Sequence, residues 1–172
     1  QLNTAVVPGT IYDLEINMNI ADCRNNSAET VLNGRFAFSE NIEAGDLILN
    51  EILHNPFTSG SRFIELYNPS EKVMDVADLF LAKRLGPDSI GFDEVVETPC
   101  LIFPGDYLVL TPKPADIMER YTVENPNALV ETNVPSYDDQ EDQVVLLTLG
   151  SVVVDELAYT REFHNALLDD RN

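Results

Sequence analysis

Short apolar runs, separated by turn residues, extend along most of the chain and decide what it can fold into. In "IYDLEINMNI" (11–20), apolar and polar residues alternate, which is the pattern of a strand with one buried face. Further strands are predicted at 33–40, 46–53, 61–68, 76–84 and 143–149, at 152–159, and twice within 100–112. Because many short strands at this spacing are typical of packed sheets, we expect an all-β sandwich or barrel.

Turn residues occupy the connections between these runs. The segments 54–61, 104–106 and 150–151 contain Pro or Gly, and a polar connection is expected over 85–99. One short helix is predicted at 113–121, where Pro114 suits a first turn, Asp116 lies near the start and Arg120 near the end.

The N-terminal part needs separate treatment. Residues 1–43 supply two strands around the polar loop 22–30, and an isolated hairpin is only marginally stable in water. We therefore expect these strands to pack on the remainder, 44–172, or to belong to a preceding domain. The chain begins without Met and without a charged-then-apolar leader, so we expect a mature protein or an excised piece of one.

The net charge excludes several partners. Thirty acidic residues against ten basic ones give a charge of −20, which repels nucleic acid and anionic membranes. The same charge attracts a cation such as calcium, although its commoner use is to keep a surface soluble. No apolar run approaches the roughly 18 residues that a membrane span requires.

The two cysteines leave two alternatives open. Cys23 and Cys100 form no CxxC pair, so a structural zinc site is not expected. They form a disulfide if the compartment is oxidising, or remain two separate buried thiols.

Two glutamates stand among apolar residues. Alternate residues of a strand share a face, so the odd-numbered residues of 47–53, Glu51 among them, are expected to line up. Glu65 shares a face with Phe63 and Tyr67 in the same way. If the two strands pair as a hairpin, the two carboxylates lie close together.

A catalytic role for this pair is disfavoured. Glycosidase carboxylates lie roughly 5–9.5 Å apart at a substrate groove, which a sandwich hairpin does not normally offer. In the structural alternative, Glu51 and Glu65 accept backbone N–H bonds from the turn at 54–61 or pair with Arg62 or Lys72. The motifs GxSxG, HExxH, GxGxxG and the P-loop are absent, so no enzyme is predicted.

The acidic run 136–143 is the best cation candidate. It offers the hard oxygen ligands that calcium prefers, from Asp138, Asp139, Glu141 and Asp142. The spacing is not that of an EF-hand loop, and a solvated acidic loop is the simpler interpretation.

Several ordered motifs resemble the lamin tail domain, in particular its bacterial versions in secreted and cell-surface proteins. They are "GDLILNEILHNP" (45–56), "FIELYNPSEKVMDVADLFL" (63–81), "FPGDYLVLT" (103–111) and "VVLLTLGSVVVDELAY" (144–159). The resemblance covers about 44–160 and implies an immunoglobulin-like β-sandwich. The positions of Asn50, Glu51, Glu65 and Asn68 coincide with the family pattern, which implies a structural role for them. The segment around "IADCRNN" (20–26) resembles the last strands of a preceding Ig-like domain.

The resemblance implies a non-catalytic interaction or spacer module of a larger secreted or cell-surface bacterial protein. Its expected partners are neighbouring domains, another surface protein or a surface glycan, and the N-terminal strands offer a strand-swapped dimer. A glycan is less favoured because Trp is absent. The DNA contacts of animal lamin tails are not expected at this charge. The alternatives are a calcium-stabilised adhesive module using 138–142 and an accessory domain of an extracellular hydrolase.

Overall fold

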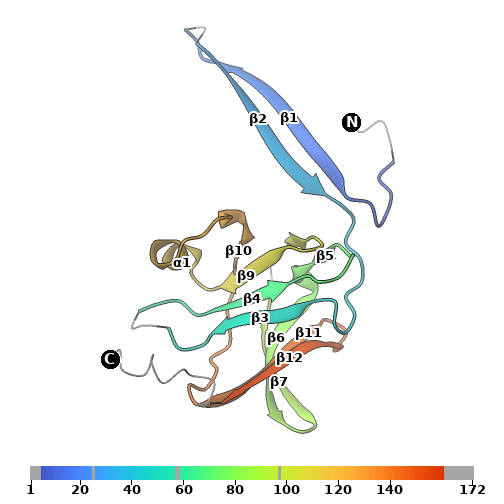
Figure 1. Ribbon diagram of the computed structural model, residues 1–172, viewed down its shortest axis with the longest axis vertical. Helices are drawn as coiled ribbons and strands as arrows, with labels where there is room; N and C mark the ends of the chain where they lie inside the picture. Colours follow the sequence, from blue (N-terminus) through green and yellow to red (C-terminus); the bar gives the residue numbers. More distant parts are fainter. Residues whose placement is uncertain (1–4, 25, 57–58, 97, 161–172) are drawn as a thin grey trace.

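The computed structural model describes residues 5–24, 26–56, 59–96 and 98–160. Strands make up most of its regular secondary structure, and they form a β-sandwich from which one long hairpin projects (Figure 1). The all-β sandwich class expected from the strand pattern is thereby confirmed.

The first four-stranded sheet has the order β10-β9-β4-β3. Its strands are β3 (Ile48–Leu53), β4 (Phe63–Tyr67), β9 (Tyr107–Thr111) and β10 (Leu129–Glu131). Neighbours pair antiparallel except β10, which runs parallel to β9. Parallel neighbours need a crossover connection, and here it contains helix α1 (Pro114–Arg120) and the 3-10 turn η2 (Pro126–Ala128).

The second four-stranded sheet is fully antiparallel, with the order β12-β11-β6-β7. Its strands are β6 (Leu79–Gly86), β7 (Ser89–Val95), β11 (Glu141–Thr148) and β12 (Val153–Thr160). A two-stranded pair, β5 (Met74–Asp75) with β8 (Leu101–Ile102), and the 3-10 turn η1 (Val76–Asp78) complete the sandwich.

One apolar core lies between the two sheets. Alternate residues of the central strands point into it, so Ile64 and Leu66 of β4 meet Leu146 of β11 in the same buried cluster. The cluster begins at Ile42 in the sequence and takes none of its described members from the hairpin. The sandwich therefore has its own core.

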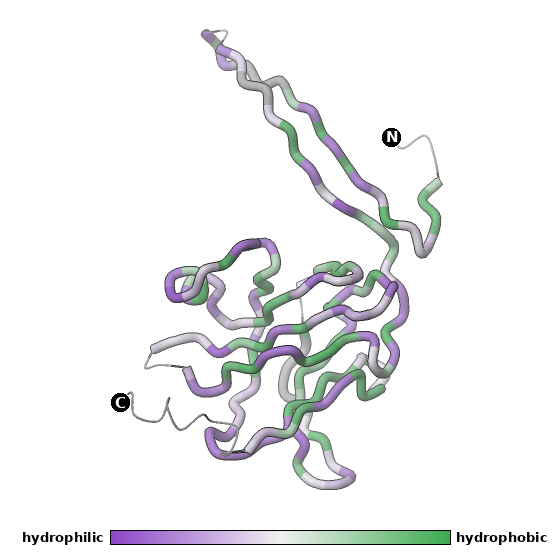
Figure 2. Tube along the Cα trace, viewed as in Figure 1, coloured by the Kyte–Doolittle hydropathy of each residue, from purple (hydrophilic) through white to green (hydrophobic). Residues whose placement is uncertain are grey.

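The hairpin consists of β1 (Tyr12–Ala21) and β2 (Ser27–Phe36), paired in register along their whole length. Tyr12 stacks on Phe36 at its base, with ring centroids 5.1 Å apart. Figures 1 and 2 show the two strands extending away from the sandwich, with green and purple residues alternating along each of them.

The segment that follows the hairpin is fastened to the sandwich. The Glu40 N–H donates to the Val73 carbonyl, and the Gly45 N–H donates to the Val154 carbonyl of β12. The Lys72 ammonium lies 2.7 Å from carboxylate oxygens of both Glu43 and Asp46. This part of the chain thus joins the sandwich before β3 begins.

Most predicted elements have counterparts in the structure. The strands expected at 11–20, 46–53, 61–68, 143–149 and 152–159 correspond to β1, β3, β4, β11 and β12. The run 76–84 contains η1 and most of β6, the region 100–112 holds β8 and β9, and the helix predicted at 113–121 is α1.

Two expectations about loops are wrong. The predicted loop 22–30 shrinks to a short tip because β2 starts at Ser27, where pairing with β1 overrides the polar composition. The strand predicted at 33–40 accordingly ends early, at Phe36. The polar connection expected over 85–99 contains β7, which pairs with β6 between Phe80 and Gly86. In both places the backbone hydrogen bonds are made with the partner strand, and the amino-acid composition of the segment does not indicate that pairing.

Candidate functional site

The site is built on a β-bulge in β3. Leu49 pairs with Leu66 and Glu51 pairs with Glu65, so Asn50 is the extra residue on the bulged strand. The bulge reverses the alternation of β3. Glu51 therefore leaves the face that it was expected to share with the apolar residues of 47–53 and lies exposed on the outer face of the sheet.

The outer face carries a row of large side chains. On β4, Phe63, Glu65 and Tyr67 alternate with the core residues, as the sequence predicts. Tyr107 of β9 is the register partner of Tyr67, and their rings stack with centroids 4.6 Å apart. The rings and the Glu65 carboxylate thus share one surface.

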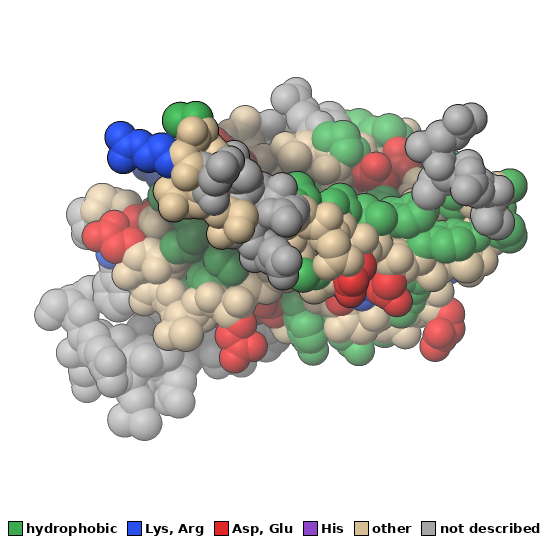
Figure 3. Space-filling model, turned by 90° about the horizontal axis from the view of Figure 1, so that it is seen from above, with side chains coloured by type: hydrophobic (Ala, Val, Ile, Leu, Met, Phe, Trp, Pro, Cys, Tyr) green, Lys and Arg blue, Asp and Glu red, His purple; other side chains and the backbone are tan. Residues whose placement is uncertain are grey.

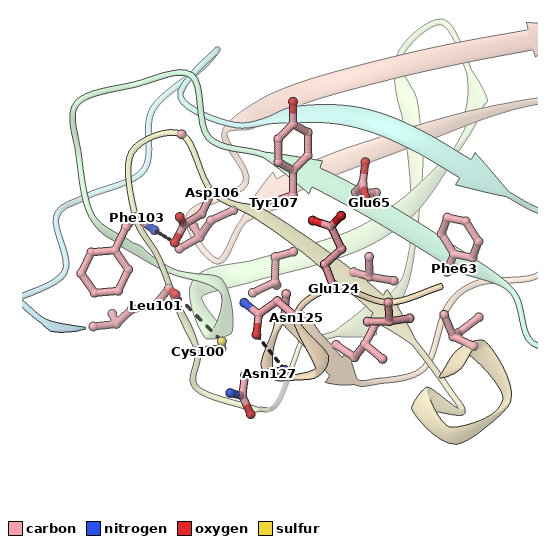
Figure 4. Close-up of a pocket in the computed structure, with 18 of the residues that line it drawn as sticks. Phe63, Glu65, Cys100, Leu101, Phe103, Asp106, Tyr107, Glu124, Asn125 and Asn127 are labelled. Atoms are coloured by element: carbon pink, nitrogen blue, oxygen red, sulfur yellow. Dashed lines mark hydrogen bonds between the residues drawn. The ribbon is translucent and has the colours of Figure 1, made fainter. Parts of the chain in front are cut away.

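A cleft of about 830 Å³ lies over this face. The outer face of the sheet, with Phe63, Glu65 and Tyr107, forms one side of the cleft. The connection that follows α1, with Tyr121, Glu124 and Asn125, forms the other side (Figure 4). The Phe63 and Tyr121 rings meet edge-to-face across it, with centroids 6.1 Å apart. The parallel placement of β10 brings this connection over the sheet and so creates the cleft.

Acidic groups dominate the charges of the cleft. Glu51, Glu65, Asp106 and Glu124 all line it. The guanidinium of Arg35, from the base of the hairpin, pairs with Asp106 at 2.6 Å and lies 4.2 Å from the centre of the Phe103 ring. Asn50 donates its side-chain amide to Glu65 at 2.6 Å. No salt bridge to Glu51, Glu65 or Glu124 occurs within the described ranges.

Nucleophilic chemistry is not favoured in this cleft. Cys100 is the cysteine that lines it, and burial, reinforced by the Asp75 charge, raises the pKa of the Cys100 thiol. A thiol with a raised pKa is protonated at neutral pH and is a weak nucleophile. The arrangement is suited to holding a ligand by charge and ring contacts.

Asn68 is a buried structural junction. Its amide group donates to the carbonyls of Lys72 and Ile102, and its side-chain oxygen accepts from the N–H and the hydroxyl of Ser70. Its backbone N–H donates to the Asp106 carbonyl, and its backbone carbonyl accepts from the Gly105 N–H, both in the turn before β9. These bonds join the turn after β4 to the turn before β9.

Glu51 and Glu65 do not have the hydrogen-bond and ion-pair partners that the structural alternative predicted. Lys72 binds Glu43 and Asp46, so it is not the partner of Glu51 or Glu65. The hydrogen bond that the structure gives Glu65 comes from the Asn50 side chain and not from the turn at 54–61. Their expected proximity is confirmed, because they occupy opposite positions on paired strands.

The acidic run at the start of β11 is largely tied up in local bonds. Asp142 lies 2.6 Å from the Lys83 ammonium and accepts the N–H groups of Asp138 and Gln143. Asp138 accepts the N–H of Gln140, while Asp139 and Glu141 are exposed. In the described part of the chain, no group of three or more His, Cys, Asp or Glu is arranged to hold a metal ion. A calcium site here stays a prediction.

The cysteines are separate thiols in the structure, but the expectation that both are buried is wrong for Cys23. Cys23 is free and exposed at the hairpin tip, whereas Cys100 is free and half-buried before β8.

Arg35, Phe103 and Glu124 are among the contributors to the cleft that sequence reasoning missed. Arg35 lies 71 residues before its partner Asp106. No local pattern marks such a long-range contact, and only the placement of the hairpin base reveals it.

Two four-stranded sheets packed over one core define an immunoglobulin-like β-sandwich domain. The chain belongs to the lamin tail domain family, whose model matches residues 40–161. This is a non-catalytic family of Ig-like domains. A comparison with curated proteins gave no match. Among the helices that the structure describes, none is long and apolar enough to cross a membrane.

Proposed function

We propose that the chain is a non-enzymatic interaction and spacer module of a larger secreted or cell-surface bacterial protein. In this proposal the β1–β2 hairpin docks onto a β-sheet of a neighbouring domain or of another surface protein. The observation that carries it is the division of the hairpin into one apolar and one polar face.

The register defines the two faces. Tyr12, Leu14 and Ile16 of β1 face the same side as their partners Phe36, Gly34 and Leu32 of β2. The next pairs along, such as Asp13 with Arg35 and Glu15 with Asn33, face the opposite side. We call the first set the apolar face.

Beyond Tyr12 and Phe36 at its base, the apolar face has little cover from the described part of the chain. Leu14 and Ile16 are each 42% exposed, and Leu32 is 51% exposed. Figure 3, seen from the end where the hairpin projects, shows hydrophobic side chains at the surface among acidic ones. A two-stranded sheet with an apolar side needs a second layer to be stable in water.

The contacts that fix the hairpin to the sandwich leave its apolar face available. Arg35 belongs to the polar face and binds Asp106 and Phe103 of the sandwich, so at the hairpin base the apolar face looks the other way. Ten residues per strand give a ribbon of roughly 33 Å. A net charge of −20 on each copy opposes self-association, which favours a neutral or basic sheet as the partner.

Site-specific photo-crosslinking on the full-length protein in its native cells tests the proposal. A benzophenone side chain replaces Leu32 on the apolar face or, as the matched control, Asn33 on the polar face. We expect crosslinks to a β-domain of the same chain or of a surface protein from position 32 and not from position 33. Equal yields from both positions, or crosslinks only between identical hairpins, overturn this docking mode; the latter indicates a strand-swapped or paired dimer.

The non-enzymatic part has its own test. Purified residues 1–172 are assayed against nucleic acid, glycan and peptide substrates, with Glu65→Gln as the comparison. We expect no turnover in either protein. An activity that disappears in Glu65→Gln contradicts the proposal and points to the carboxylates of the cleft.

A further inference from the structure

We propose that the cleft over the outer face of β4 and β9 binds an organic cation. The chemical class is an ammonium or guanidinium group on an apolar stem, as in a lysine or arginine side chain of a peptide or in a polyamine. This inference does not depend on docking by the apolar face of the hairpin, because the cleft lies against the polar face at the hairpin base.

The first argument is an uncompensated charge pair. Glu51 and Glu65 are directly opposite on antiparallel strands, where Cβ atoms lie about 4.5–5.5 Å apart. Like charges at such positions destabilise a sheet. Glu124 adds a third carboxylate from the facing wall, and none of the three has a salt-bridge partner within the described ranges. A bound cation converts this repulsion into attraction.

The second argument is the apolar and aromatic surface beside these carboxylates. Figure 4 shows Phe63, Glu65, Tyr107 and Glu124 around the cleft. The Tyr107 ring, half exposed and supported from behind by Tyr67, offers a face to a cation. Tyr121, which is exposed and packs edge-to-face on the buried Phe63, provides an apolar contact for the stem of the ligand.

The volume also suits an organic ligand. A cleft of about 830 Å³ falls within the roughly 300–1,000 Å³ typical of small-molecule sites. The walls come from β3, β4, β9, the α1–β10 connection and the hairpin base, so a ligand contacts several elements at once. A lone surface carboxylate provides no such enclosure.

Other ligand classes fit less well. A metal ion needs several ligands converging on one point, and the described residues contain no such group. An anion needs a free positive group, but the Arg35 guanidinium in the cleft is already paired with Asp106. A neutral sugar leaves the repulsion between Glu51 and Glu65 in place.

Calorimetric titration at low ionic strength tests the site on the whole chain. The probes are an acetylated and amidated Lys-Lys dipeptide, spermidine, and a norleucine dipeptide that keeps the stem and lacks the charge. We expect the two cations to bind and the norleucine peptide not to bind. Tighter binding of the dipeptide assigns the cation to a peptide, and tighter binding of spermidine assigns it to a polyamine.

Variants locate the binding. Glu51→Gln and Glu65→Gln are each expected to weaken cation binding up to about fivefold, the effect of one exposed ion pair. The matched control Asp88→Asn removes the same charge from the exposed β6–β7 turn and is expected to leave affinity unchanged. Tyr107→Leu removes the ring without changing charge and is expected to weaken binding as well.

Three results overturn the inference. They are equal losses in the control and the cleft variants, equal affinity for the norleucine peptide, and no binding of either cation to wild type. Melting curves on each variant separate unfolding from loss of the site. Because Leu32 does not line the cleft, and the cleft variants leave the apolar face of the hairpin intact, failure of one proposal does not decide the other.

Discussion

Glu51 and Glu65 are register partners on β3 and β4, and the bulge at Asn50 is what places them on the same face. Without the bulge, Glu51 continues the alternation of Leu47 and Leu49 and points into the core. The sheet thus accepts an unfavourable carboxylate pair on its outer face in place of a buried charge.

Relieving this repulsion is expected to stabilise the fold. Glu51→Gln should raise the free energy of unfolding by about 0.2–1 kcal/mol, since it removes one of two like charges. Urea denaturation measures the change, with Asp88→Asn as the control for net charge. The gain should shrink at high salt, where the repulsion is screened. A stability unchanged at low salt means that the two carboxylates do not interact.

Asn68→Ala is expected to be strongly destabilising. It leaves the carbonyls of Lys72 and Ile102 and the Ser70 groups without their buried partner. We expect a loss of about 3 kcal/mol in urea denaturation. Asn55→Ala, at an exposed position, should change stability by less than about 0.5 kcal/mol. Similar effects of the two substitutions contradict the role of Asn68 as a junction.

Acid should weaken the contact between Asp142 and Lys83. Burial raises the pKa of the Asp142 carboxyl, but Lys83 and the backbone N–H groups of Asp138 and Gln143 outweigh it and hold the pKa below the ordinary 3.8. A carboxyl whose pKa is lowered on folding stabilises the fold above its unfolded pKa, and that stabilisation is lost as pH falls through the folded value.

The direction of the Asp142 pKa shift predicts how Asp142→Asn changes the pH dependence of stability. The variant should be less stable than wild type at pH 7, and the difference should narrow once the pH drops below about 3.8. Urea denaturation at several pH values measures it. A difference that stays constant down to pH 2.5 shows that the charge on Asp142 is not what stabilises the fold.

The two thiols should react at very different rates. Cys23 is exposed, whereas Cys100 is half-buried with a raised pKa. Iodoacetamide at pH 8, followed by peptide mass spectrometry, should label Cys23 first and Cys100 slowly. Denatured protein, in which both react alike, is the control. A protein that takes no label until it is reduced contains a Cys23–Cys100 disulfide instead.

Removing residues 1–38 should leave the sandwich folded. The described core starts at Ile42, and the hairpin contributes Arg35, with its contacts to Asp106 and Phe103. We expect calorimetry to show a cooperative transition and a loss of no more than about 2 kcal/mol. Arg35→Ala in the full chain should reproduce most of that loss. Loss of the transition means that the sandwich depends on the hairpin.

Local patterns predicted the strands that carry their own alternation. The runs at 11–20, 46–53 and 61–68 became β1, β3 and β4 because apolar residues at every second position must be buried together. The strand predicted at 33–40 covered only the end of β2, and β7 was missed, because their pairing, and not their composition, makes them strands. Strand formation in such segments is decided by the neighbour.

The cleft was beyond local prediction for a related reason. The proximity of Glu51 and Glu65 followed from pairing adjacent strands, but the bulge that turns Glu51 outward has no sequence signal of its own. Glu124 and Arg35 reach the cleft through a parallel crossover and a projecting hairpin. Both are tertiary arrangements whose cause lies many residues away.

The first and last strands of the sandwich are joined to each other. The Gly45 N–H bonds to the Val154 carbonyl, and the Leu49 N–H bonds to the Asp155 carboxylate at 2.8 Å. A stretching force applied at the two ends of the sandwich therefore acts on these two hydrogen bonds before it reaches the central strands. We therefore expect the mechanical strength of the domain to depend on these few bonds between its entry and its exit, with Asp155 as a side chain that contributes to them.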